Sequence, residues 1–312
     1  MGNITPWIIL ISYVLVLLLI DFFILHKKNR DTSVKRAIFE TIFFITNALI
    51  FSGFIYWFYN ISLVDNVNNL EPAQAVVKYL TGYIIELSLS VDNLFVIAII
   101  FTSFKIPRQY QHNLLFLGIL GAIVFRAILI SVGLILINRV HGMNIVFGLF
   151  LLFTALKMLK KEAEHKEVKE PKGIIKLFRF SNELHDGKYI TKVNGKTVFT
   201  ALFGALITIE LTDLLFALDS IPAIFSVTTD PYIVFSSNIF AVMGLRSLYF
   251  FLSNMLEKFG YLKYSVFAIL LFVSLKLMTA SLIEIPEWFS LLFIGISLLS
   301  GIYISTINIK NK

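Results

Sequence analysis

The 312-residue chain contains no cysteine, so it has no disulfide framework, thiolate metal site or catalytic thiol. Charged residues make up only 15% of it, whereas apolar residues reach 57% and phenylalanine alone occurs 31 times. This composition excludes a disordered chain and an ordinary soluble domain. It is typical of a helical protein that crosses the lipid bilayer several times.

Long apolar stretches recur along the whole chain. Each is long enough to cross about 30 Å of hydrocarbon, allowing for tilt. We therefore predict an all-α polytopic fold with about nine transmembrane helices. The stretches lie at residues 7–25, 37–59, 79–103, 113–137, 144–159, 198–221, 232–253, 264–282 and 288–308.

Basic residues are concentrated in alternate loops between these stretches. Ten lysines and arginines lie from Lys160 to Lys196, and five more follow the first stretch. The positive-inside rule then places the N-terminus outside and the C-terminus in the cytoplasm. The membrane that we expect is the inner membrane of a bacterial cell. The net charge of +7 is explained by this orientation, and a nucleic-acid site is not expected.

Two stretches of the chain are versions of one another, and both carry acids inside apolar helices. Residues 86–101 read ELSLSVDNLFVIAIIF, and residues 213–228 read DLLFALDSIPAIFSVT. A charged group at the centre of a membrane helix costs at least about 2.5 kcal/mol, so acids in duplicated positions indicate a function. In the alignment Glu86 matches Asp213, Asp92 matches Asp219, and Asn93 matches Ser220.

The similarity between the two halves continues downstream. Arg126 in GILGAIVFRAI matches Arg246 in NIFAVMGLRSL, and Lys157 matches Lys276. The spacing from arginine to lysine is 31 residues in one half and 30 in the other. Each repeat is therefore predicted to hold three helices. Because three is odd, the repeats are inverted relative to each other, as in many secondary transporters.

These boundaries predict five regions. A polar segment between the repeats contains Asn194-Gly195 flanked by KYITKV and KTVFT, which predicts a small β-hairpin. The regions are a two-helix element at 1–60, a first repeat at 79–159, a cytoplasmic loop with the hairpin at 160–197, a second repeat at 198–279 and a last helix at 288–308.

The geometry of the acids predicts that their helices are interrupted. Positions six apart on an unbroken helix, such as Glu86 and Asp92, lie about 240° apart around its axis. Local unwinding would bring them together, and Pro222, three residues after Asp219, removes a backbone donor in the second repeat. Two interrupted helices that meet near the midplane are therefore expected.

A site built from these residues would offer only oxygen ligands, because the five histidines fall in loops or at span ends. Mn²⁺, Mg²⁺ and Ca²⁺ suit such ligands, whereas Zn²⁺ and copper prefer imidazole or sulfur. The candidate ligands are Glu86, Asp92, Asn93, Glu210, Asp213, Asp219 and Ser220.

An equally weighted alternative is that the acids form buried ion pairs, since charges inside membranes normally pair. Both roles can coexist if a carboxylate that releases its metal takes a base or a proton, which would couple transport to protons. Asp21 and Glu40 are weaker candidates near the cytoplasmic interface. The candidate counter-charges are Arg126, Lys157, Arg246 and Lys276.

The chain carries no sequence motif of an enzyme. It lacks a glycine-rich phosphate loop, a nucleophile elbow and a His-Glu-x-x-His pair. We therefore expect no catalytic residues.

Three motifs resemble the TerC family of integral membrane proteins: YIIELSLSVDNLFVIAIIF (83–101), IELTDLLFALDSIPAIFSVTTDP (209–231) and SSNIFAVMGLRSLYFFL (236–252). The resemblance covers nearly the whole chain. It implies manganese efflux, metallation of secreted enzymes or tellurium resistance, and a relation to LysE-type exporters. The family's acidic positions would correspond to the seven candidate ligands, and Asp21 within LLLIDFFIL also falls on a family motif. Ala201 stands where many relatives have proline.

The expected function is export of Mn²⁺ through a midplane carboxylate site. Two alternatives stay open. One is a transporter of Ca²⁺ or an amino acid. The other is a membrane partner that does not transport but assists metallation or assembly of secretory-pathway proteins, with residues 160–197 as its docking surface.

Overall fold

The computed structural model describes residues 3–25, 34–66, 68–140, 142–160, 180–181, 187–193, 196–253, 262–279 and 285–310. These ranges contain ten α-helices, one short π-helix and three short strands. In order they are α1 (Thr5–Ile20), η1 (Asp21–Leu25), α2 (Val34–Asn60), α3 (Pro72–Ser103), α4 (Arg108–Arg139), α5 (Met143–Lys160), β1 (Phe180–Ser181), β2 (Ile190–Val193), β3 (Lys196–Thr200), α7 (Ala201–Phe225), α8 (Pro231–Met243), α9 (Leu245–Ser253), α10 (Leu262–Thr279) and α11 (Glu287–Lys310).

The helices follow the apolar stretches of the sequence. Six candidate spans are long and apolar enough to cross a membrane, and the fifth of them runs through both α8 and α9. The apolar parts of α5 and α10 are shorter, and α3 interrupts its apolar run with acids. The structure thus supports a multi-pass helical protein with six clear candidate spans, and the count of nine stays a prediction.

The predicted interruptions of the two acid-bearing helices are wrong. Both α3 and α7 are continuous. Pro222 cannot donate to the carbonyl of Leu218, but it lies in the last turn of α7 and only three helical residues follow it, so the helix is not interrupted at the acids. In α3, the Ser88 hydroxyl donates to the carbonyl of Ile84 within an intact helix. The break falls instead between α8 and α9, at Gly244. Glu86 and Asp92 therefore lie on different faces of one helix.

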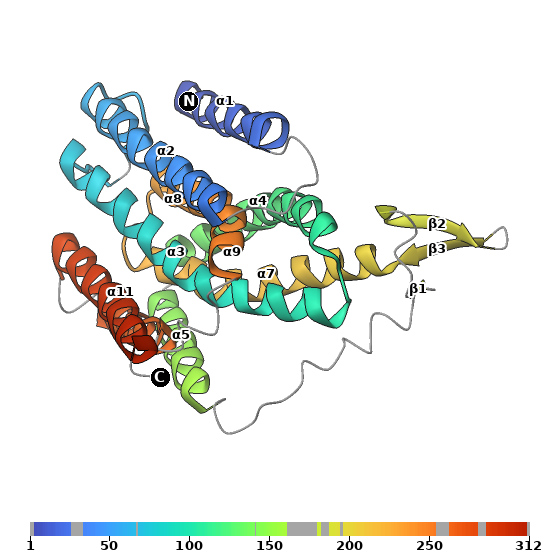
Figure 1. Cartoon of the computed structure of the whole chain (residues 1–312). Coiled ribbons are helices and arrows are strands. Elements are labelled where there is room, and N and C mark those ends of the chain that lie inside the picture. Colours follow the sequence, from blue (N-terminus) through green and yellow to red (C-terminus); the bar gives the residue numbers. More distant parts are fainter. Residues whose placement is uncertain are drawn as a thin grey trace.

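The polar segment before α7 contains a small sheet over the residues where a hairpin is predicted. β2 and β3 pair antiparallel, with Val193 opposite Lys196, and β1 pairs parallel to β3. Asn194 and Gly195, which join them, lie outside the described residues. Figure 1 shows the strands projecting from the helices, with β3 running directly into α7.

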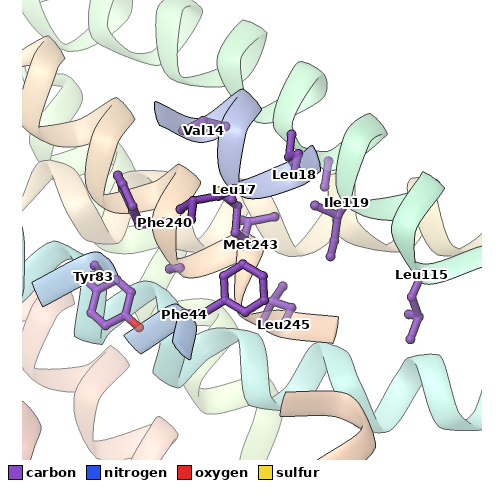
Figure 2. Packing of buried hydrophobic residues seen from close by; sticks show 14 of the residues in the cluster. Val14, Leu17, Leu18, Phe44, Tyr83, Leu115, Ile119, Phe240, Met243 and Leu245 are labelled. Atoms are coloured by element: carbon purple, nitrogen blue, oxygen red, sulfur yellow. The ribbon is translucent and has the colours of Figure 1, made fainter. Parts of the chain in front are cut away.

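The largest buried apolar cluster joins the N-terminal helices to the centre of the bundle. Leu17 of α1 and Phe44 of α2 are buried in the same cluster as Phe240 and Met243 of α8 (Figure 2). Ile119 of α4 belongs to it too. The first two helices therefore pack directly against the part of the bundle that holds the buried charges.

The helices of the two halves pack in a crossed arrangement. The first acid-bearing helix, α3, packs against α8, and the second, α7, packs against α4. α3 also contacts α7, and α5 packs closely on α10. Gly148 permits that approach, because a Cβ there would lie 3.0 Å from the carbonyl oxygen of Ser274. The last helix, α11, covers α10 and α3 (Figure 1).

Candidate functional site: a buried charge cluster

Arg126 of α4 binds carboxylates from both acid-bearing helices. Its Nε and Nη2 donate to Asp213 of α7 at 3.1 and 2.9 Å, and its Nη1 donates to Glu86 of α3. Arg126 and Glu86 are each only 1% exposed. The fork of the guanidinium suits this two-sided contact, because it can donate in parallel to one carboxylate and still reach another.

Glu86 has further hydrogen-bond partners on neighbouring helices. Asn238 of α8 donates to its Oε2 at 2.8 Å, and Ser90, one turn later on α3, donates to its Oε1 at 3.1 Å. A buried carboxylate needs such partners, because burying a charge without them costs several kcal/mol. The contacts bring four helices, α3, α4, α7 and α8, together at one point. Two carboxylates there share one guanidinium.

The second arginine of the repeat pattern binds a different acid. Arg246 of α9 pairs with Asp21 at the start of η1, and both side chains are buried. Glu40 of α2 is also buried and accepts from the partly exposed Arg36 at 3.0 Å. The electrostatic neighbours of Arg246 are Asp21, Glu40 and Arg36. Asp21 and Glu40, expected near the interface, thus belong to a buried cluster with one of the predicted counter-charges.

The remaining predicted residues lie in several places. The side-chain oxygen of Asp219 accepts from Thr154 of α5 at 3.0 Å. Lys276 donates to Ser290 of α11 at 2.9 Å. The side chains of Asp92 and Lys157 lie outside the described part of the structure.

Glu210 lies one turn before Asp213 on α7 and faces a glycine of α4. A Cβ built on Gly121 would overlap the carboxylate of Glu210, so this helix contact depends on the missing side chain. Within the described residues, Glu210 Oε2 is buried and has no hydrogen-bond partner.

A cavity of about 30 Å³ lies beside the Arg126 cluster. It has room for about one water-sized particle. Its walls come from α3, α4, α7, α8 and α9, and its polar lining includes Asn93, Asp213 and Arg246. The two arginine clusters are therefore neighbours across this space.

Several buried oxygens around the site have no hydrogen-bond partner among the described residues. A hard cation would satisfy such atoms, since it takes carboxylate, amide and hydroxyl oxygens as ligands. Among the side chains that the structure describes, however, no three acids or histidines are grouped as a metal site. The unpartnered atoms are Asn93 Oδ1, Glu210 Oε2, Ser220 Oγ and Asn238 Oδ1.

Two residues that bind the predicted acids were missed in the sequence. Asn238 donates to Glu86 and Thr154 donates to Asp219, yet neither is a charged residue in a duplicated position. Asn238 lies within the motif SSNIFAVMGLRSLYFFL, so a search for polar residues in the apolar stretch 232–253, which also carries Arg246, could have found it. Thr154 carries no comparable signal.

The fold and the cluster define a multi-pass helical membrane protein with buried charges between its helices. Residues 71–312 match the model of the "Integral membrane protein TerC family". The chain belongs to that family.

The relatives share nearly the full length of the chain and are bacterial. An "Uncharacterized membrane protein" of Rickettsia felis is 40% identical over 304 residues, which is 96% of this chain and 97% of the relative. A protein of Salmonella typhi named "Putative membrane-bound redox modulator Alx" is 38% identical over 282 residues, covering 89% of this chain and 86% of the relative. No solved structure matches the chain.

Proposed function

We propose that this TerC-family protein exports divalent cations, Mn²⁺ foremost, from the cytoplasm through the site around Arg126. The observation that carries the proposal is the contact of one guanidinium with carboxylates of both acid-bearing helices, Glu86 and Asp213. One guanidinium balances one carboxylate, whereas a divalent cation balances both. The arginine can therefore act as the counter-charge of the two carboxylates while no cation is bound.

The crossed packing of the helices supports an inverted repeat. Under a pseudo-twofold axis in the membrane plane, the contact of α3 with α8 becomes the contact of α7 with α4. The contacts of α3 with α7 and of α5 with α10 map onto themselves. Transporters with inverted repeats place their substrate near the midplane, where the repeats meet. Arg126 lies at that meeting point.

The position of the cavity supports a route from the cytoplasm. With the predicted topology, α4 runs outward, so its lining residues Leu115 and Ala122 lie on the cytoplasmic side of Arg126. A cation that reaches the cavity would meet Asn93 and Asp213 first, with Arg126 blocking its way outward. Release of Glu86 and Asp213 by Arg126 would open that way.

The ligand chemistry supports a hard cation. Glu86, Asp213 and Asn93 would supply the first oxygens, with Ser220 and Glu210 completing the set as the helices move. Asp92 and Asp219, on other faces of α3 and α7, would act at another step of the same path. A carboxylate that takes a proton after the metal leaves would couple export to the proton gradient.

Flux through the purified full-length protein in vesicles tests the proposal directly. An entrapped indicator that Mn²⁺ quenches should report uptake, and a panel of Mg²⁺, Ca²⁺ and Mn²⁺ should rank the cations. Asp213→Asn keeps the shape of the side chain but removes its charge, and we expect it to reduce flux to that of empty vesicles. Glu71→Gln changes an exposed acid at the start of α3 and should transport like the parent.

The ligand assignment is wrong if Asp92→Ala and Asp219→Ala both transport at the parent rate. Competition by lysine would favour an amino-acid exporter, and proton release that accompanies Mn²⁺ flux would support coupling.

The name of the Salmonella relative suggests a role in redox balance. This chain has no cysteine, so a thiol–disulfide mechanism within it is excluded. A partner that does not transport predicts copurifying proteins and no flux for any cation. We propose no enzymatic activity.

A further inference from the structure

A second, larger opening lies away from the charges, between α4, α5 and α7. It is a groove of about 320 Å³. Every residue that lines it is leucine, valine, isoleucine, phenylalanine, alanine, glycine or proline; they include Leu129 and Val132 of α4, Phe147 and Phe150 of α5, and Leu218 of α7. A polar cargo would find no hydrogen-bond partner among these side chains.

The groove exists because α5 is closely packed against only one of its neighbouring helices. α5 packs closely on α10 and makes only sparse contacts with α4 and α7. Beneath the groove, Ile130 and Leu134 of α4 pack against Ala217 and Ile221 of α7. The floor is thus tightly packed, while the space between α5 and its two neighbours stays open.

In the other half of the protein, the last helix of the chain, α11, covers the described faces of α10 and α3 that correspond to α5 and α7. If Lys157 is aligned with Lys276, groove residue Val146 corresponds to Ser265 of α10, and Phe150 corresponds to Ile269. Ser265 donates to the carbonyl of Ser297 in α11 at 2.6 Å. Ser265 and Ile269 are 6% and 0% exposed, whereas Val146 and Phe150 are 55% and 39% exposed.

We propose that this groove is a binding site for one acyl chain of a membrane lipid, which covers a surface whose counterpart in the other half is covered by α11. The groove lies on α4, α5 and α7, and both α4 and α7 are candidate membrane spans. Lipid tails are as apolar as leucine, so a bound chain gains packing contacts without a polar cost. A helix about 10–12 Å in diameter could only lie across the groove, as α11 lies on α10 and α3, whereas a single acyl chain is narrow enough to enter it.

The site adjoins one of the predicted ligands. Leu218 lines the groove and immediately precedes Asp219, whose partner Thr154 lies one turn after Phe150 on α5. A chain in the groove would contact both helices on either side of that hydrogen bond. With the predicted topology, the groove opens in the outer half of the bilayer, so the chain would belong to an outer-leaflet lipid.

Photolabelling of the full-length protein in vesicles tests the site. The vesicles would contain phosphatidylethanolamine, phosphatidylglycerol and a rising fraction of phosphatidylcholine with a diazirine in the middle of one acyl chain. Peptide mapping would locate the label. We expect labelling of groove residues to saturate as the probe fraction rises, while labelling of the exposed face of α11 rises in proportion to it.

Val146→Trp should fill the groove and remove the saturable labelling. The matched control is Leu149→Trp on the same helix, since Leu149 is half exposed but does not line the groove; it should leave the saturable labelling unchanged. Labelling of the groove in simple proportion to the probe would mean bulk lipid contact only and overturn the proposal. So would a groove that the probe does not label at any fraction.

Discussion

Arg126 and Arg246 occupy matching positions in the two similar halves of the sequence but bind different kinds of partner. Arg126 joins the acids of the repeats themselves, Glu86 and Asp213. Arg246 binds Asp21, which precedes both repeats in the chain. Arg126 binds both acids where the helices α3, α4 and α7 meet, and Arg246 therefore depends on the N-terminal part of the chain for its counter-charge.

The same asymmetry appears one turn away. In the alignment, Glu210 of the second half corresponds to Tyr83 of the first, and Gly121 corresponds to Ala241. Glu210 fits against α4 because Gly121 has no side chain. An acid and the glycine that accommodates it are therefore present in only one of the two predicted repeats.

The strongest way to break the comparison is to remove the shared arginine. Arg126→Met leaves the buried Glu86 and the largely buried Asp213, whose side chain is 12% exposed, without their counter-charge. We expect a loss of about 3–5 kcal/mol in the free energy of unfolding. The unfolding midpoint of the protein in detergent would measure it. Adding Glu86→Gln and Asp213→Asn to the same chain should restore much of the loss. Unchanged stability of Arg126→Met alone would show that the cluster is not held by charge.

A smaller effect is expected at the second arginine. Asp21→Asn removes the charge that Arg246 binds but keeps an oxygen that can accept from it, so we expect a loss of about 1.5–3 kcal/mol. A double-mutant cycle with Arg246→Gln would measure the coupling between the two side chains in the same unfolding assay. No coupling would mean that the N-terminal helices are held by apolar packing alone.

The smallest effect on stability is expected at Gly121. Gly121→Ala would push the flexible Glu210 side chain aside, with a change in unfolding free energy within about 1 kcal/mol. If Glu210 completes the cation site, Mn²⁺ flux should nevertheless fall. Gly53→Ala on α2 is the control, because a Cβ there meets nothing within 4 Å. Equal flux in both variants would exclude Glu210 from the site.

Much of the fold could be predicted from apolar periodicity and length. The predicted apolar stretches fall largely on helices, because a segment that must bury its backbone in lipid has few alternatives to a helix. The continuity of α3 and α7 could not be predicted from the sequence. Pro222 indicates a break only if it lies in the middle of a helix, and its distance from the end of α7 depends on where the following turn begins.

The candidate site was predictable as a set of residue types but not as a set of contacts. Duplicated acids and bases stand out because charges inside a membrane are costly. Which base binds which acid could not be predicted, since four bases can pair with five acids in many ways and every such pairing neutralises the same charge. The contacts of Asn238 with Glu86 and of Thr154 with Asp219 bridge different helices, so no spacing along the chain encodes them.

The sequence by itself determined that the chain is a helical membrane protein, because hydrophobic length and costly buried charges are properties of each segment alone, and it predicted two similar halves. Only the tertiary structure decided that Arg126 binds Glu86 and Asp213 while Arg246 binds Asp21. It also decided that α11 covers α10 and α3, while the groove between α4, α5 and α7 stays open. These outcomes depend on which helices pack together, and the distances between side chains follow from that packing.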